Sequence, residues 1–151
     1  MIHLERQCAS AAHWTDGYYR QLFRAEGSGP QRVVLVVEAP VPAESDSAQA
    51  AVSHGEVLGF LVARGVAQEW ELENIAVAPS ARRQGVGTAL VQALLAHVRQ
   101  ADGKAVFLEV RASNLPAREL YEKAGFKPAG SRKSYYMGPM EDAVLYRYEF
   151  R

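Results

Sequence analysis

The chain has 151 residues, which predicts one domain, and its 48% hydrophobic and 23% charged residues are typical of a globular protein. Seventeen basic and seventeen acidic residues cancel, so no overall positive field favours nucleic acid, and an anionic ligand needs a local site. The N-terminus lacks a secretion-signal pattern, and no apolar run approaches the roughly 20 residues of a membrane helix. The lone Cys8 cannot form an internal disulfide. We therefore expect a cytoplasmic protein, without membrane association, in which Cys8 is an ordinary thiol or core residue.

The first third of the sequence predicts helix followed by strand. Aromatic and aliphatic side chains recur at helical spacing in residues 11–26, with Thr15 or Asp16 as the N-cap. Residues 31–38 are rich in β-branched side chains and predict a strand. Residues 39–55 are rich in Pro, Ser and Ala without periodicity, which predicts a mobile hairpin loop.

The middle of the sequence predicts two more strands, over 56–67 and 70–77, and then a helix that reaches about residue 101. Apolar residues recur along this helix at 3.6-residue spacing and define its inner face: Val86, Ala89, Leu90, Ala93, Leu94 and His97. We therefore expect His97 to pack at the edge of the core rather than to act in catalysis.

The last third predicts a strand, a helix and two final strands. Residues 105–112 are nearly all apolar, as expected of a strand buried on both faces. A helix follows over 113–124, capped by Ser113 or Asn114 and ended by the next glycine. Strand patterns over 126–136 and 143–150 complete an interleaved order, which predicts an α/β fold with a mixed central sheet of six to seven strands flanked by helices.

A glycine-rich turn, RRQGVG at residues 82–87, opens the long helix. Gly85 and Gly87 have no Cβ and allow a ligand to approach the backbone, while the helix N-terminus presents free N–H groups and partial positive charge. Arg82 and Arg83 add charge, so a phosphate site is favoured. The spacing matches neither a Walker A loop nor GxGxxG, which leaves a purely structural turn as the alternative.

Two further residues invite opposite interpretations. Glu109 interrupts an apolar strand, and it is either a structural partner of Arg111 two residues on or a general base in a cleft, since burial favours the protonated form of a carboxyl group. Tyr121 lies on an apolar helix stripe, which indicates core packing unless its hydroxyl donates a proton at the open end of the sheet.

These segments together resemble the GNAT N-acetyltransferase superfamily. The strings LENIAV, RRQGVG, LEVRASN and RELYEKAGF occur in the order of that family's motifs, and the glycine turn fits its acetyl-CoA pyrophosphate signature as Arg82-x-x-Gly85-x-Gly87. Within the superfamily, LEVRASN, the pair Tyr135-Tyr136 and the segment 141–143 are most similar to the bacterial ribosomal-protein alanine N-acetyltransferases. The resemblance runs from about residue 71 to the C-terminus, and the first 65 residues depart from the pattern.

The resemblance implies one N-acetyltransferase domain over 1–151, with an acceptor-shaping part at about 1–70, an acetyl-CoA part at about 71–125 and C-terminal strands at about 126–151. It implies that acetyl-CoA is the cosubstrate and that no metal takes part. The pantetheine arm would pair with main-chain groups of one strand, and the pyrophosphate would lie on the glycine turn, the cofactor residues being Ile75, Ala76, Val77, Arg82, Arg83, Gln84, Gly85, Val86, Gly87, Thr88 and Asn114. Glu109 would be the general base and Tyr121 the general acid of a direct transfer.

The acceptor is implied to be a primary amine, most specifically the N-terminal amine of the eighteenth small-subunit ribosomal protein. Tyr135 and Tyr136 would wall the peptide N-terminus, or else simply pack between strands. Glu73 and Glu141 would attract a cationic acceptor, or else be solvated surface charges. The alternatives are a GNAT enzyme for a small amine, such as a polyamine, amino-acid derivative or aminoglycoside, and a CoA-binding module without catalysis. A monomer or homodimer without nucleic acid or membrane partners is expected.

Overall fold

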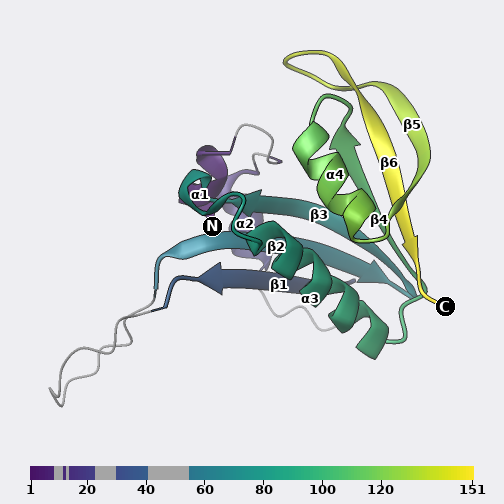
Figure 1. Cartoon of the computed structure of the whole chain (residues 1–151), viewed down its shortest axis with the longest axis horizontal. Helices are drawn as coiled ribbons and strands as arrows, with labels where there is room; N and C mark the ends of the chain where they lie inside the picture. Colours follow the sequence, from purple (N-terminus) through teal and green to yellow (C-terminus); the bar gives the residue numbers. More distant parts are fainter. Residues whose placement is uncertain (9–11, 13, 23–29, 41–54) are drawn as a thin grey trace, which may run out of the picture.

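The computed structural model describes residues 1–8, 12, 14–22, 30–40 and 55–151. Within these residues six strands form one mixed sheet in the order β1-β2-β3-β4-β6-β5 (Figure 1). The strands are β1 (Gln31–Glu38), β2 (Val57–Val66), β3 (Glu69–Val77), β4 (Ala105–Arg111), β5 (Lys127–Tyr136) and β6 (Glu141–Glu149). The α-helices of this part of the chain are α1 (Ile2–Arg6), α2 (Asp16–Leu22), α3 (Val86–Gln100) and α4 (Leu115–Lys123), and a 3-10 turn, η1, spans Pro79–Ala81.

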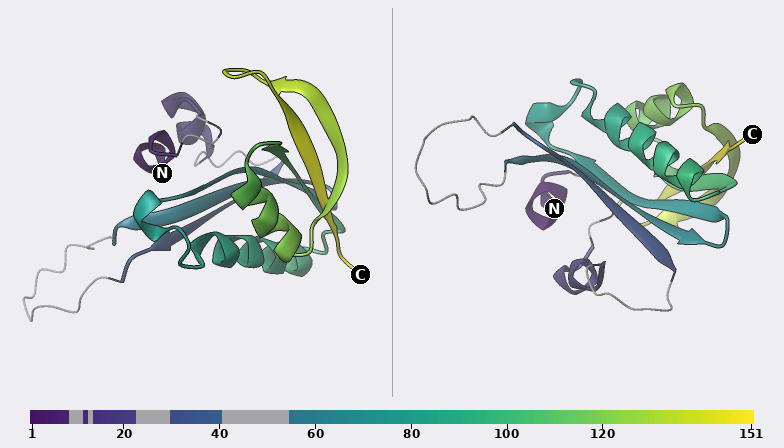
Figure 2. Two further views of the ribbon diagram at one scale, coloured as in Figure 1. Left: turned by 45° about the horizontal axis from the view of Figure 1, so that its top comes forward. Right: turned by 90° about the horizontal axis from the view of Figure 1, so that it is seen from below.

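Helices cover both faces of the sheet, and each face has its own apolar layer (Figure 2). On one face α3 buries Leu90, Leu94 and Val98 and packs on β1, β2 and β3, and α4 lies beside it. On the opposite face α1 and α2 bury Leu4 and Tyr19 against β2 and β3. Burial of these apolar side chains is the main stabilising contribution to the fold.

The two central strands, β3 and β4, run parallel but pair only at their starts, from Glu69–Ala105 to Glu71–Phe107. Beyond Leu72 the register between β2 and β3 shifts, so Glu73 is an extra residue in β3, a β-bulge. A bulge bends its strand and increases the local twist. The other edge of β4 stays paired with β6 along its whole length. The sheet therefore forks between the second halves of β3 and β4.

The predicted α/β fold with a mixed sheet is confirmed, and all six strands lie where the sequence places them. Thr15 caps α2 through its Oγ1, which accepts from the Tyr18 N–H at 3.3 Å, and α2 accounts for the described part of the helix expected over 11–26. The loop expected over 39–55 lies mostly outside the described residues. The five-residue α1 was not predicted, because it is too short for helical periodicity to show.

Two predictions about burial were wrong. The buried face of α3 contains Val91 and Leu95, whereas Ala89 and Ala93 are exposed, because the layer beneath α3 follows the stripe that starts at Leu90. Strand β4 is not buried on both faces: its residues alternate, and Phe107, Glu109 and Arg111 lie on a partly exposed face. His97 is half-buried with its ring edge-on to Trp70, in agreement with a packing role.

We expect Leu94→Ala to lower the free energy of unfolding by about 2–5 kcal/mol, because it opens a cavity at a fully buried position of α3. Gln92→Ala, at an exposed position of the same helix, is the matched control and should change stability by less than about 0.5 kcal/mol. Urea unfolding of the three proteins gives both values, and equal stabilities would contradict the assigned core face.

Candidate functional site

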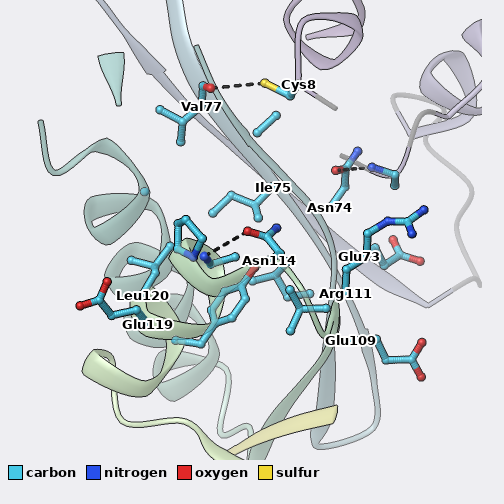
Figure 3. Close-up of a pocket in the computed structure, with 18 of the residues that line it drawn as sticks. Cys8, Glu73, Asn74, Ile75, Val77, Glu109, Arg111, Asn114, Glu119 and Leu120 are labelled. Atoms are coloured by element: carbon cyan, nitrogen blue, oxygen red, sulfur yellow. Dashed lines mark hydrogen bonds between the residues drawn. The ribbon is translucent and has the colours of Figure 1, made fainter. Parts of the chain in front are cut away.

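A cleft of about 1150 Å³ opens at the fork between β3 and β4, with the start of α3 and the side of α4 as its walls (Figure 3). In Figure 3, Ile75 and Val77 belong to β3, while Asn114, Glu119 and Leu120 belong to the α4 side. The cleft brings together most of the residues predicted from the sequence: Glu73, Ile75, Ala76, Val77, Arg82, Arg83, Gly85, Val86, Gly87, Thr88, Glu109, Asn114, Tyr121, Tyr135 and Tyr136. Gln84 does not line it, because its Nε2 donates to the Ser80 carbonyl at 2.8 Å and closes the turn after η1.

The N-terminus of α3 is suited to an anion. Its N-cap, Gly85, has φ +83°, a left-handed conformation that favours glycine, and no side chain caps the helix. The first turn holds no acidic residue, so its N–H groups and partial positive charge face the cleft without a competing carboxylate. Arg82 and Arg83 are exposed beside this turn.

The edge of β3 that faces β4 supplies main-chain groups to the cleft. Strand pairing with β4 stops at Glu71, so no strand of the described chain bonds to the β4-facing edge of β3 from Leu72 to Val77. Such an edge can pair with an extended amide-containing ligand in the way that a further strand would. The Val77 carbonyl already accepts from the Cys8 thiol at 3.3 Å, and Cys8 is buried, as expected of an ordinary thiol.

Helix α4 holds Asn114 and Tyr121 toward the cleft. Asn114 is the N-cap, and its side-chain oxygen accepts from the Ala117 N–H at 3.3 Å. Tyr121 is 3% exposed and packs against the rings of Phe126 and Tyr146 while it also lines the cleft. Burial, with a smaller effect from Tyr136, raises the pKa of the Tyr121 phenol. Tyr121 is therefore packed in the core and also borders the cleft, and its hydroxyl stays protonated at neutral pH.

Glu109 lies on the partly exposed face of β4, and its carboxylate points away from α4 in Figure 3. Its Oε1 lies 2.8 Å from Nε of Arg132 on β5, and its side chain is 21% exposed. The pair with Arg111, which was the structural alternative for Glu109, is not formed. The Arg111 guanidinium instead binds Glu141 at 3.3 Å and the hairpin carbonyls between β5 and β6. Glu109 is thus a carboxylate with one exposed cationic partner and room for a further ligand.

The tyrosine pair at the end of β5 closes the cleft near Glu109. A hydrogen bond to Glu109 raises the pKa of Tyr135, which is 46% exposed. Burial, followed by the nearby Glu109 charge, raises the pKa of Tyr136 to about 12. The Arg111 guanidinium lies 4.4 Å from the centre of the Tyr136 ring and fixes it. Both hydroxyls are neutral donors at physiological pH.

Glu73 is not a free anion in the cleft. Its carboxylate lies 3.6 Å from Arg32 and 3.5 Å from Arg64, and its side chain is 12% exposed. Tyr18 donates to it at 3.4 Å. Burial raises the pKa of Glu73 even though both guanidinium groups oppose the shift. Two cations therefore compete with any cationic acceptor at this residue.

A second cavity of about 550 Å³ lies on the sheet face opposite α3, and Glu71 and Glu109 line both cavities. Its other walls come from β2, β5 and β6 and include Arg64 and Arg132. Glu109 is therefore reached from the cleft and from the face of the sheet that α3 and α4 leave open.

Some residues of the site were not predicted. Trp14 and Tyr18 line the cleft from the segment that leads into and through α2, and their rings pack with centres 4.5 Å apart. Arg132 reaches Glu109 from β5, which is separated from β4 by β6. Helical spacing indicates the packing of Trp14 on Tyr18, four residues apart, but no spacing along the chain signals that they line the cleft or that Arg132 faces Glu109, since only the fold brings these residues together.

The Acetyltransferase (GNAT) family matches residues 3–126. The chain belongs to this family. The [ribosomal protein bS18]-alanine N-acetyltransferase of Escherichia coli is 39% identical to this GNAT chain over 61% of the chain and 64% of its own length, so the chain spans less than two thirds of that relative. A Bacillus subtilis relative is 32% identical over 87% of the chain and 76% of its own length.

Solved structures agree with the family. The crystal structure of the Escherichia coli ribosomal-protein-S18-alanine N-acetyltransferase superposes with a TM-score of 0.72 at 28% identity, over 98% of this chain and 84% of that one. A Bacillus anthracis acetyltransferase in complex with acetyl coenzyme A matches with a TM-score of 0.59 at 26% identity, over 66% of this chain and 59% of that one. Acetyl-CoA is thus the cosubstrate of the GNAT fold found here.

The described residues contain no group of three or more His, Cys, Asp or Glu that could hold a metal ion. Among them no helix has the length and apolarity that a membrane span requires.

Burial raises the pKa of Glu73 in the folded state, so ionisation of this carboxyl group opposes folding. The contribution of Glu73 to the free energy of unfolding therefore falls as the pH rises through the raised pKa. We therefore expect the stability of Glu73→Gln, relative to the wild type, to increase from about pH 4 to about pH 7. Thermal unfolding across this range measures it. Glu149→Gln, at an exposed position, should show no such trend, and a trend of opposite sign for Glu73→Gln would mean that the arginines dominate.

Proposed function

We propose that this protein transfers the acetyl group of acetyl-CoA directly to the N-terminal α-amine of a protein, a function supported by its similarity to relatives named [ribosomal protein bS18]-alanine N-acetyltransferase. The observation that carries the proposal is the position of Glu109, which borders both the cleft at the fork and the cavity on the opposite face. A donor in the cleft and an acceptor amine on the other side would meet at this carboxylate.

The donor would lie along the cleft, with its amide-containing arm on the free edge of β3 at Ile75, Ala76 and Val77 and its pyrophosphate on the α3 N-terminus. Main-chain N–H groups from Val86 to Thr88, together with Arg82 and Arg83, would carry the phosphate charge. Gly85 keeps the approach open, since nothing lies within 4 Å of the Cβ it lacks. Asn114 has amide protons left for the donor after its oxygen caps α4.

Glu109 would take the proton from the attacking ammonium, directly or through a water, because only the neutral amine can attack a thioester. Arg132 and Tyr135 would orient the carboxylate before the amine arrives. Tyr121 would give its proton to the departing CoA thiolate, and its raised pKa keeps that proton in place beforehand. Alignment of both substrates in one site supplies a further part of the rate.

The acceptor would enter from the face that carries α1 and α2, where Trp14, Tyr18 and Glu73 meet the rim formed by Tyr135 and Tyr136. Neutral tyrosine hydroxyls and aromatic faces suit a peptide N-terminus. A small-amine acceptor is the alternative. The second cavity adjoins the cleft at Glu71 and Glu109, so it would offer a longer, peptide acceptor room beyond the reacting amine, which supports the peptide.

A direct assay tests the proposal: the protein is incubated with acetyl-CoA and either Ala-starting peptides of ribosomal proteins, other N-terminal peptides, or small amines, and CoA release is followed. Preference for the Ala-starting peptides is expected. Turnover of small amines alone would assign the alternative function, and acetyl-CoA binding without turnover of any amine would assign a non-catalytic module.

We expect Glu109→Gln to bind acetyl-CoA with little change and to acetylate about 10²–10⁴ times more slowly, the range for loss of a positioned base. Glu149→Gln on the adjacent strand β6 removes an exposed, ion-paired carboxylate and is the matched control. Rates across pH with the preferred acceptor measure the effect. Full activity of the Glu109→Gln variant would contradict the role of general base.

We expect Gly85→Val to weaken acetyl-CoA binding about tenfold or more, since a side chain would enter the phosphate approach at a position of positive φ. Gly130→Val controls for backbone strain, because Gly130 also has a positive φ and open surroundings but lies outside the cleft. Titration calorimetry gives both affinities. Equal losses in the two variants would trace the effect to strain and not to the phosphate seat.

A further inference from the structure

Three buried polar side chains, Glu5 of α1, Tyr19 of α2 and Asn74 of β3, form a cluster that the proposed chemistry does not use. Their exposed fractions are 1%, 3% and 4%. Asn74 Nδ2 donates to Glu5 Oε1 at 2.6 Å and lies 3.3 Å from the Tyr19 hydroxyl, which also bonds to Glu5. We call these three residues the Glu5 cluster.

Glu5 is a buried carboxylate without a cation, because no salt bridge among the described residues includes it. A charge in such a place is strongly destabilising unless donors surround it. The Trp14 main-chain N–H also donates to Oε1 of Glu5, at 3.2 Å, so neutral donors from three different segments converge on one carboxylate. Burial, with Glu5 next, raises the pKa of the Tyr19 phenol, which therefore remains a donor.

The donors of the Glu5 cluster lie next to the substrate-facing residues. Trp14, whose N–H bonds to Glu5, lines the cleft and packs its ring on Tyr18, which also lines the cleft. Asn74 follows Glu73 of the β-bulge and precedes Ile75, where the free edge of β3 faces the cleft. Because of the bulge, the adjacent residues Glu73 and Asn74 both contact α2, through Tyr18 and Tyr19 respectively.

We propose that Glu5 and Asn74 are positioning residues that fix the acceptor wall, Trp14 and Tyr18, at a set distance from the donor strand β3. Apolar packing alone would let α1 and α2 slide on the sheet, because it has no directional preference. Hydrogen bonds to a single buried carboxylate do not allow sliding without leaving a charge unpaired. The role rests on the proposed function, since it concerns the amine acceptor.

A positioning role and a purely structural role of the Glu5–Asn74 bond lead to different kinetic results. Loss of the Glu5–Asn74 bond should raise the acceptor KM about tenfold, the factor that corresponds to a hydrogen bond to a charged group, and should leave acetyl-CoA affinity nearly unchanged. A purely structural role would lower the melting temperature and the amount of active protein without changing the KM of the fraction that is folded.

A reciprocal exchange provides the test. Asn74→Asp places two carboxylates together and should give the full rise in acceptor KM, whereas Glu5→Gln alone keeps the acceptor oxygen and should have a smaller effect. The double variant Glu5→Gln with Asn74→Asp restores one amide and one carboxylate with the bond reversed, and should recover most of the loss. Val98→Ala, a core truncation in α3 on the other face of the sheet, controls for lost stability and should not change the KM.

The readouts are the acceptor KM, the acetyl-CoA affinity and the hydrogen exchange of the Trp14 amide, which should be slow in the wild type and the double variant and fast in Asn74→Asp. Unchanged KM in Asn74→Asp, or no recovery in the double variant, would overturn the positioning role alone. Absence of peptide turnover by the wild type itself would instead overturn the proposed function and this role with it.

Discussion

The separation of β3 from β4 after Glu71 and Phe107 is the constraint on which the rest of the structure depends. Two parallel strands in one sheet would normally continue side by side and satisfy each other's main-chain groups. Here the bulge at Glu73 turns β3 away, while β4 keeps its partner β6. The fork costs strand hydrogen bonds, and it provides a cleft with a free strand edge, a helix N-terminus and a carboxylate at its junction.

The electrostatic character of this cleft comes from local groups and not from the net charge of the protein. The chain is neutral, yet the α3 N-terminus has no acidic residue in its first turn and has two arginines beside it, which suits a phosphate. Toward the other end of the cleft, Glu109, Tyr135, Tyr136 and Tyr121 combine one carboxylate with hydroxyls whose pKa values are raised. A proton acceptor and proton donors thus lie together at neutral pH.

The N-terminal helices contribute more than cover for the sheet. Their apolar layer holds them on β2 and β3, and the Glu5 cluster fixes where they sit. Tyr18 and Arg32 approach Glu73 from this side, so the bulged residues contact the proposed acceptor wall, and the adjoining Ile75 faces the cleft in which we propose that the donor lies. The bulge therefore links the geometry of the two substrate sides through a few residues of one strand.

The sequence by itself determined the order of the strands and of the helices from α2 onward, the glycine turn with its adjacent arginines, and the family. These depend on local periodicity and on motifs whose residues are close along the chain. A cap at Ser113 or Asn114, which the structure assigns to Asn114, and the positive φ of Gly85 follow from local backbone chemistry in the same way. The tertiary structure decided three other features: which face of β4 is open, that Glu109 faces Arg132 instead of Arg111, and that Glu73 is enclosed by two arginines. Each of these depends on strand register and on residues far apart in the chain, and the Glu5–Asn74 contact across 69 positions is the clearest case. No local pattern can encode such a contact, since its energy arises only when folding removes both side chains from water.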